Sequence, residues 1–238
     1  MQNNFHRIHL GISNVYLLSC SQGYLLIDTG YKNQYTRFLR HLTNLGVEPT
    51  HIRYLLLTHH HHDHAGFTAQ LTLQSGAKVI CHQAALAHLQ RGSSAETMQP
   101  VNRRTRVLLS LFGLIHRDST YPPYEFKTGD ITVAADDAKL LRCLGIEGEI
   151  VFTPGHCSDS ISVLLDDGSA FVGDSAMNFL QMAGIHHRPI YIEDIDAVFE
   201  SWQKLIAKGA KMIYPTHGSP YPVESLAQSL SRFTGSSV

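Results

Sequence analysis

Five histidines and one aspartate directly follow an apolar segment in the first third of the chain. Tyr54–Leu57 is apolar, and residues 58–66 read Thr-His-His-His-His-Asp-His-Ala-Gly. Imidazoles together with one carboxylate form a nitrogen-rich ligand set that suits zinc first and iron or manganese less well. A purification tag sits at a chain end and is not preceded by a buried strand, so this run predicts a metal site.

The alternation of side chains along an extended backbone sorts the histidines. If the chain stays extended after Tyr54–Leu57, His59 and His61 face one side, and His60 and His62 face the other. We therefore expect His59 and His61 to bind metal. His60 and His62 are expected to pack or to lie at the surface.

The last two residues of the histidine run, Asp63 and His64, directly precede a segment with helical spacing, residues 65–73. Asp63 is expected at the start of this helix, where free backbone N–H groups and the helix dipole favour a carboxylate. His64 is expected to turn inward beside it.

Three further residues of metal-binding type each follow a segment with strand character. The residues are His156, Asp174 and His217, and the segments are Gly148–Phe152, Ala170–Val172 and Lys211–Tyr214. A lone histidine after a strand is more often a structural residue. In layered α/β proteins, however, sites are built where strands end at their carboxyl edge. Together with His59, these positions predict one shared site.

The elements that must position these residues can be read along the chain. Other expected strands are Phe5–Leu10, Val15–Ser19, Tyr24–Ile27, Lys78–Cys81 and Ile161–Leu165. Expected helices are 35–45, 84–89, Glu193–Lys208 and Val223–Phe233. The strand–turn–strand order of the first half recurs in the second, which suggests an old internal duplication.

Length and charge limit the classes of function. The 238 residues are expected to form a single domain, 1–238, with a sizeable core. A net charge of -1 argues against a partner bound through its phosphates, so no nucleic acid is expected. The four cysteines are scattered and no signal peptide is visible at residues 1–11, which favours the cytoplasm. No apolar run is long enough to span a bilayer.

Residues 91–127 form the least regular part of the sequence. Four arginines precede the apolar run Val107–Ile115, which predicts a basic, amphipathic helical insertion. Three roles remain open: a lid over a substrate with an apolar portion, the surface of a homodimer, or a membrane-surface contact. Ordinary packing on the core is an equal alternative.

The ordered motifs resemble those of the metallo-β-lactamase superfamily. They are His59-x-His61-x-Asp63-His64, Pro154-Gly155-His156, Gly173-Asp174 and Thr216-His217-Gly218. The resemblance covers about Ser13 to Gly218. It implies an αββα sandwich, an α/β fold in which two mixed sheets pack face to face with helices outside.

The resemblance also implies a distribution of ligands between two metal ions. His59, His61 and His156 would hold one ion, Asp63, His64 and His217 the second, and Asp174 would bridge them. Seven ligands are too many for one tetrahedral ion, which agrees with two divalent ions, zinc first. A bridging hydroxide would be the nucleophile, and Asp63 the catalytic residue that orients it.

Several neighbours are expected to support this site. Asp28, Thr58 and Ser158 are candidate partners of the ligands. His186 and His187 follow Asp174 and are placed at the pocket. Cys157 is expected to pack beside His156.

These observations predict a binuclear metal-dependent hydrolase of a small-molecule ester, lactone or thioester. A phosphodiesterase, with the arginines near 103–106 as its binding handle, is one alternative. An iron-dependent persulfide-type oxygenase and a non-enzymatic metal-binding protein are others. Met177 stands where the related acyl-homoserine lactonases usually carry a tyrosine, which disfavours a lactonase of that kind.

Overall fold

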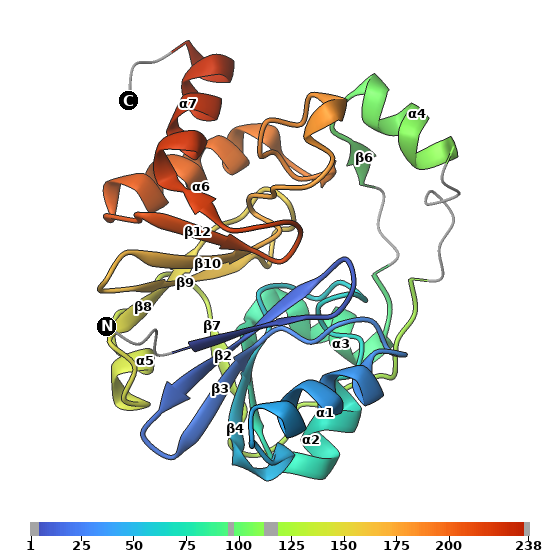
Figure 1. Ribbon diagram of the computed structural model, residues 1–238, viewed down its shortest axis with the longest axis vertical. Helices are drawn as coiled ribbons and strands as arrows, with labels where there is room; N and C mark the ends of the chain where they lie inside the picture. Colours follow the sequence, from blue (N-terminus) through green and yellow to red (C-terminus); the bar gives the residue numbers. More distant parts are fainter. Residues whose placement is uncertain (1–4, 95–97, 112–118, 236–238) are drawn as a thin grey trace.

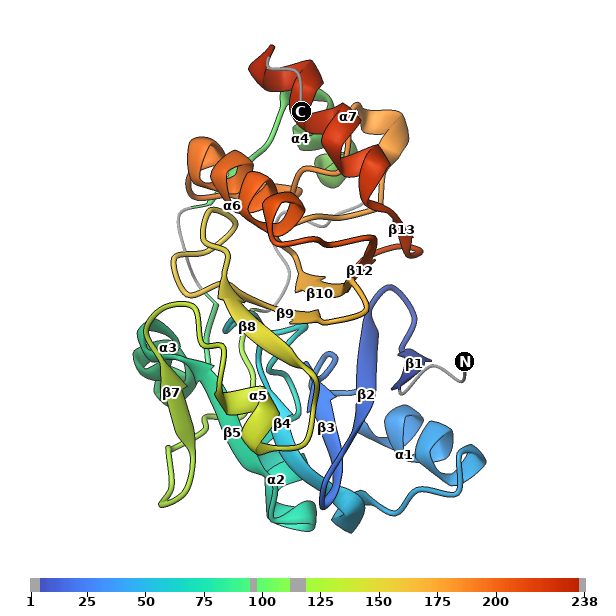
Figure 2. The same ribbon diagram turned by 90° about the vertical axis from the view of Figure 1, so that its left-hand side faces the viewer.

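Two β-sheets stack face to face in the computed structural model, and helices cover the outer face of each sheet (Figure 1). The structure describes residues 5–94, 98–111 and 119–235. A view turned by 90° shows α6 and α7 outside one sheet and α1–α3 outside the other (Figure 2). The expected αββα sandwich is therefore present.

The first sheet has six strands in the order β1-β2-β3-β4-β5-β7. Their bounds are β1 Phe5–His9, β2 Asn14–Cys20, β3 Gly23–Ile27, β4 Ile52–Leu56, β5 Lys78–His82 and β7 Ile131–Val133. The first three strands are antiparallel neighbours, whereas β4, β5 and β7 add in parallel after β3. The parallel strands are apolar because helices cover their outer face.

The second sheet has five strands in the order β13-β12-β10-β9-β8. Their bounds are β8 Gly148–Phe152, β9 Ile161–Leu165, β10 Ser169–Gly173, β12 Met212–Pro215 and β13 Tyr221–Pro222. Three antiparallel strands followed by a parallel one, β8-β9-β10-β12, repeat the pairing of β1-β2-β3-β4. This repeated pairing matches the duplication that the sequence suggests.

Amphipathic helices cover the two sheets. The helices are α1 Tyr35–Asn44, α2 Thr68–Ser75, α3 Leu86–Arg91, α4 Arg103–Leu111, α5 Leu140–Cys143, α6 Ile195–Ala207 and α7 Val223–Thr234. Helix α1 buries Tyr35, Phe38 and Leu42 at the i, i+3, i+7 spacing of one helix face. Asp194 caps α6 through its side chain, which accepts from the backbone N–H groups of Asp196 and Ala197.

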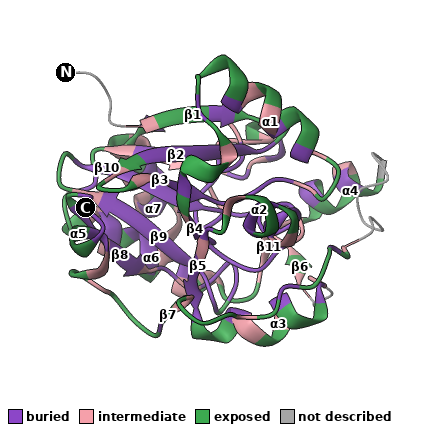
Figure 3. Ribbon diagram, turned by 90° about the horizontal axis from the view of Figure 1, so that it is seen from below, coloured by how far each residue is buried: buried purple, intermediate pink, exposed green. Residues whose placement is uncertain are grey.

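Three hydrophobic clusters lie between the four layers. One lies between α1–α3 and the first sheet, one between the two sheets, and one between the second sheet and the α6–α7 pair. Buried residues accordingly run along the strands, while the outer helices carry the exposed ones (Figure 3). Burial of apolar surface in these clusters is the main stabilising contribution.

An aromatic cluster joins the two sheets. Phe5 and Tyr16 of the first sheet pack on Phe171 and Tyr214 of the second, with ring centroids 4.9–5.9 Å apart. The Tyr16 hydroxyl donates to the Pro215 carbonyl at 2.7 Å. These contacts fix β1 and β2 of the first sheet relative to β10 and β12 of the second.

The structure differs from the sequence-based expectation around Asp63. Helix α2 begins at Thr68, with Phe67 before it, rather than at Ala65, so Asp63 is not at a helix start. Residues 61–65 instead form a tight turn, in which the Ala65 N–H donates to the His61 carbonyl at 2.7 Å. This turn points the Asp63 carboxylate into the site.

The expected insertion at 91–127 contains helix α4 and a short strand, β6 Gln99–Pro100. Strand β6 pairs with β11 Tyr191–Ile192 in the second half of the chain. Residues 112–118, which hold the end of the expected apolar run, lie outside the described residues. Across residues 5–94, 98–111 and 119–235, no helix has both the length and the apolar character needed to cross a bilayer.

Candidate metal centre

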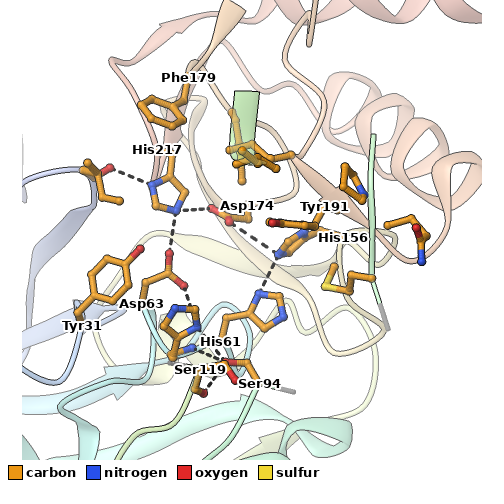
Figure 4. A pocket seen from close by; sticks show the side chains of 18 of the residues that line it. Tyr31, His61, Asp63, Ser94, Ser119, His156, Asp174, Phe179, Tyr191 and His217 are labelled. Carbon is orange, nitrogen blue, oxygen red and sulfur yellow. Dashed lines mark hydrogen bonds and ion pairs between the residues drawn. The ribbon is translucent and has the colours of Figure 1, made fainter. Parts of the chain in front are cut away.

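Seven side chains gather at one edge of the sandwich, in the loops that follow β4, β8, β10 and β12. Figure 4 shows His61, Asp63, His156, Asp174 and His217 among them. The residues are His59, His61, Asp63, His64, His156, Asp174 and His217, all of them buried. Four come from the first half of the chain and three from the second. The structure therefore brings together all seven residues that the sequence predicts as metal ligands.

Three imidazoles form one group within this cluster. His61 Nδ1 lies 3.0 Å from His59 Nε2 and 3.1 Å from His156 Nε2, and the latter two atoms are 3.2 Å apart. Ligands at about 2.0–2.1 Å around a tetrahedral zinc ion lie roughly 3.3 Å from each other. The three nitrogens are thus close enough together to hold a single ion.

Asp63, His64 and His217 form a second group, and Asp174 lies between the two groups. His217 Nε2 lies 3.1 Å from Asp63 Oδ2. Asp174 Oδ1 is 3.4 Å from His64 Nε2 and 3.5 Å from His217 Nε2. The other oxygen, Asp174 Oδ2, lies 3.7 Å from His156 Nε2. One carboxylate therefore presents one oxygen to each group.

Hydrogen bonds behind the site fix which ring nitrogen faces it. His156 Nδ1 donates to the Tyr191 carbonyl at 2.8 Å, and His217 Nδ1 donates to the Ile12 carbonyl at 2.9 Å. A carbonyl oxygen only accepts, so the proton of each neutral ring resides on Nδ1. The lone pair on Nε2 is left facing the site, as metal binding requires.

Asp28 orients His64 in the same way. Its Oδ2 lies 2.8 Å from His64 Nδ1 and accepts from the Thr58 hydroxyl at 2.7 Å, and its Oδ1 accepts from the Thr58 N–H at 2.7 Å. The Thr216 hydroxyl adds a longer bond of 3.3 Å. Asp28 has a φ of +60°, a backbone conformation that is uncommon for residues with a side chain. The expected supporting roles of Asp28 and Thr58 agree with these contacts.

Gly173 lets the two sheets approach each other beside Asp174. Its φ is +52°, and a Cβ at this position would lie 2.7 Å from the Thr58 Cβ. A side chain would push Thr58 away from Asp28. The Gly173-Asp174 motif therefore combines a ligand with the close contact that positions it.

The first group of histidines is held neutral. Burial, followed by the neighbouring histidines, lowers the pKa of His59 and of His61. Burial also lowers the pKa of His156, against the opposing effect of Asp174. Neutral imidazoles at neutral pH are the form that binds a metal ion.

The second group carries opposite charges in the metal-free protein. Burial acts to lower the pKa of His217, but the Asp174 and Asp63 carboxylates outweigh it and raise that pKa to about 9. The pKa of His64 is also raised, because Asp174 and Asp28 outweigh burial. Burial opposes ionisation of Asp63 and Asp174, yet the two histidines hold both carboxyl pKa values below their usual range.

Two buried atoms of the cluster lack hydrogen bonds within the described part of the chain. They are His64 Nε2 and Asp174 Oδ1, which face each other across 3.4 Å. Buried polar atoms of native proteins are otherwise nearly always paired. A cation between them would satisfy both, and the surrounding imidazoles and carboxylates are suitable ligands. The residues present therefore fit divalent metal.

A buried pair next to the cluster was not predicted from the sequence. The Asp159 carboxylate accepts from the His60 backbone N–H at 3.0 Å and lies 3.0 Å from His60 Nδ1. Ser158, the expected supporting residue, is exposed, and Asp159 is the buried member of that turn. The packing role expected of His60 agrees with its burial and with its ring stacked on His88 at 3.9 Å.

Cys157 supports the first group of histidines. Its side chain is fully buried, and its Sγ lies 3.3 Å from His61 Nε2, the ring nitrogen opposite the one that faces His59. This contact agrees with the expected packing role and also orients the His61 ring.

A cavity of about 620 Å³ opens above the cluster (Figure 4). Besides His61, Asp63, His156, Asp174 and His217, its walls include Ile12, Tyr31, His62, Ser94, Met98, Gln99, Arg106, Leu109, Ser119, Met177, Phe179, Ile190 and Tyr191.

His186 and His187 are not among the described residues that line the cavity, so the expectation that they line the pocket is wrong. His187 stacks on Tyr221 and lies 2.9 Å from the Met177 carbonyl, whereas His186 lies beside Arg232. Both residues have a left-handed backbone conformation, with φ of +49° at His186 and +66° at His187.

A four-layer sandwich with a histidine- and aspartate-lined edge defines a class of α/β metalloproteins. A family model described as the metallo-beta-lactamase superfamily matches residues 9–217. The chain therefore belongs to the metallo-beta-lactamase superfamily, whose members are metal-dependent hydrolases.

Individual relatives agree with this membership. A beta-lactamase-like protein 2 homolog of Drosophila melanogaster is 24% identical over 87% of this chain, which spans 59% of that relative. An atrochrysone carboxyl ACP thioesterase of Aspergillus fumigatus is 24% identical, and the match covers 92% of this chain and 54% of the thioesterase. The crystal structure of the metallo-beta-lactamase family protein TTHA1429 from Thermus thermophilus superimposes with a TM-score of 0.69 at 20% identity, over 98% of this chain and 78% of that one.

Proposed function

We propose that this chain hydrolyses a small-molecule ester, lactone or thioester with two divalent ions, zinc being the first choice. The observation that carries the proposal is the position of Asp174, with one oxygen toward each group of histidines at the base of a cavity. A carboxylate shared in this way suits two ions rather than one.

The bound ions would supply an acidified water as nucleophile and a Lewis acid for the carbonyl oxygen. Asp63 lines the cavity, and its Oδ2 is held 3.1 Å from His217 Nε2. Its lowered pKa keeps it ionised, so it accepts a hydrogen bond from the attacking water and orients that water. The same carboxylate then carries the proton toward the leaving group.

The walls of the cavity favour a substrate with an apolar portion. Apolar side chains contribute much of its lining, among them Ile12, Leu109, Met177 and Phe179. A thioester has a long, apolar acyl part in many metabolic substrates, and one relative is named an ACP thioesterase. These two observations make a thioester the first bond to test.

A phosphodiesterase is the second candidate. One guanidinium, Arg106, lines the same cavity and offers a partner for a phosphate. Two metal ions also suit in-line displacement at phosphorus.

Turnover of a lactone, a thioester and a bis-aryl phosphodiester tests the proposal, with metal content measured on the same sample. Asp63→Asn removes the ionised carboxylate while keeping the size of the side chain. Asp166→Asn, at an exposed residue paired with Arg142, is the matched control.

We expect cleavage of one bond class by the parent and the control, and a loss of at least about a hundredfold in kcat for Asp63→Asn. Two bound ions with no cleavage of any substrate would sink the hydrolase proposal. Cleavage of the phosphodiester alone would select the second candidate.

A further inference from the structure

Arg106 of helix α4 is the one lysine or arginine among the described residues that line the cavity. Its guanidinium makes a long hydrogen bond of 3.5 Å to the neutral side chain of Gln99. No carboxylate of the described residues lies within ion-pair distance of it. The positive charge of Arg106 therefore faces the cavity without an ion-pair partner among the described residues.

Two neighbouring arginines on the same helix have different surroundings. Arg103 and Arg104 are exposed and border a separate surface hollow with Val107 and Met182. Arg106 instead shares its helix face with Leu109, one turn later, and both line the cavity above the metal centre. The cavity wall thus combines one cation with an apolar surface.

A short ribbon ties this helix to the metal centre. The Tyr191 carbonyl accepts from His156 Nδ1, and Tyr191 pairs with Pro100 across the β6–β11 ladder. Val101, the residue after Pro100, donates its N–H to the Ile190 carbonyl at 2.9 Å. The strand that orients a ligand histidine therefore also fixes the start of the segment that carries Arg106.

Asn102 then sets the first turn of α4. Its Oδ1 accepts from the Thr105 N–H at 2.8 Å and from the Thr105 hydroxyl at 3.1 Å, and its Nδ2 donates to the Ala183 carbonyl at 3.3 Å. Thr105 is fully buried. Arg106 follows directly, and its backbone N–H donates to the Asn102 carbonyl at 3.1 Å. Its backbone is therefore held, while its side chain makes only the long hydrogen bond to Gln99.

We propose that Arg106 binds an anionic group of the substrate, a carboxylate or a phosphate, at a distance from the bond that is cleaved. The substrate class is then an amphipathic anionic ester or thioester. This inference rests on the proposed function, because the same cavity holds the reacting bond. The anion can belong to the acyl part or to the leaving group, and the chemistry that recognises it is the same.

Binding measurements test the role of Arg106 without turnover. The metal-loaded protein is titrated with α,ω-dicarboxylates from butanedioate to decanedioate and with the monocarboxylates of equal length. Both series offer one carboxylate to the metal centre, and only the dicarboxylates offer a second to Arg106. We expect at least one dicarboxylate to bind about tenfold more tightly than its counterpart.

Variants on one helix identify the residue responsible. Arg106→Ala is expected to abolish the preference for the dicarboxylate, Arg106→Lys to retain part of it, and Arg103→Ala to leave it unchanged. Raised salt is expected to weaken the preference, because the side chain is exposed. No preference in the parent, or an equal loss in Arg103→Ala, would overturn the inference.

Turnover separates the two sources of the anion. The substrates are a neutral acyl thioester of N-acetylcysteamine, the same thioester with a terminal carboxylate on the acyl chain, and the neutral acyl group on coenzyme A. We expect Arg106→Ala to raise KM about tenfold for one anionic substrate without changing its kcat. The KM and kcat of the neutral substrate should not change. An equal rise in KM for all three would contradict the inference. Failure of the parent on every substrate would count against the hydrolase proposal, while the binding preference would still decide the role of Arg106.

Discussion

Each histidine of the metal centre is positioned by a contact on its far side, and these contacts come from both halves of the chain. Asp28 acts on His64, Cys157 on His61 and the Tyr191 carbonyl on His156. Such partners fix the ring and its tautomer before any metal binds. The residues behind the ligands should therefore influence metal affinity almost as strongly as the ligands.

The Asp28→Asn variant tests this expectation. The new side chain would keep the size of the original but present an NH₂ group or a weaker acceptor to His64 and Thr58. We expect the affinity for zinc to fall about 10–100-fold, measured by competition with a chromogenic chelator. The exposed Asp166→Asn serves as control, and an affinity within twofold of the parent would show that Asp28 only holds the turn.

The residues of the site were predictable from the sequence, whereas some of their partners were not. His59, His156, Asp174 and His217 each follow an apolar strand, and a strand end is a local feature. Asp159 and its partner His60 are 99 residues apart, so nothing local connects them.

Among the elements, long periodic segments were predictable and short ones were not. Helices such as α1, α6 and α7 show the helical period over ten or more residues, and the structure contains all three. Two-residue strands such as β6 and β11, and the four-residue helix α5, are too short to show a period. Their conformation depends on partners far away in the chain, as β6 depends on β11.

Helix α4 provides a test at this scale. Asn102→Ala removes the hydrogen bonds to Thr105 and Ala183, and loss of such a cap costs about 1 kcal/mol. We expect hydrogen exchange in residues 98–111 to speed up about fivefold, with exchange in α6 unchanged.

The exposed Asn44→Ala, at the end of α1, is the matched control for this experiment. Equal exchange in the parent and in Asn102→Ala would mean that packing of the buried Leu109, rather than the cap, holds the helix.

For the whole molecule, the two halves meet at a group of opposite charges. Asp63 and Asp174 face His64 and His217, so the metal-free protein is held together there by ion pairs. The αββα layering was predictable from the family resemblance. The shape of the cavity was not, because its walls come from many separate segments of the chain.

The charges predict how the stability of the metal-free protein depends on pH. The pKa of His217 is raised to about 9, so its stabilising contribution is complete below the unfolded value near 6.5. That contribution is lost as the pH rises through about 9, and the raised pKa of His64 acts in the same direction.

Unfolding by urea in the presence of a chelator measures this effect. Without metal, we expect the urea concentration at the midpoint of unfolding to decrease as the pH is raised from about 6.5 to about 9.5. With zinc bound it should change less, because ligation keeps both histidines neutral. His186→Gln, at a histidine outside the cavity, should leave the dependence of this midpoint on pH unchanged over the same range. A midpoint that is constant or rises over this range without metal would contradict the charge assignment.

The division of the cluster between the two halves has a consequence for the newly made chain. His156 is synthesised 92 residues after His64, and His217 another 61 residues later. At about 5–20 residues per second, a nascent chain carries the first four residues of the cluster for roughly 8–30 s before the last one exists. During that interval the cluster on the ribosome is incomplete. Completion of the cluster therefore comes late in the synthesis of each molecule.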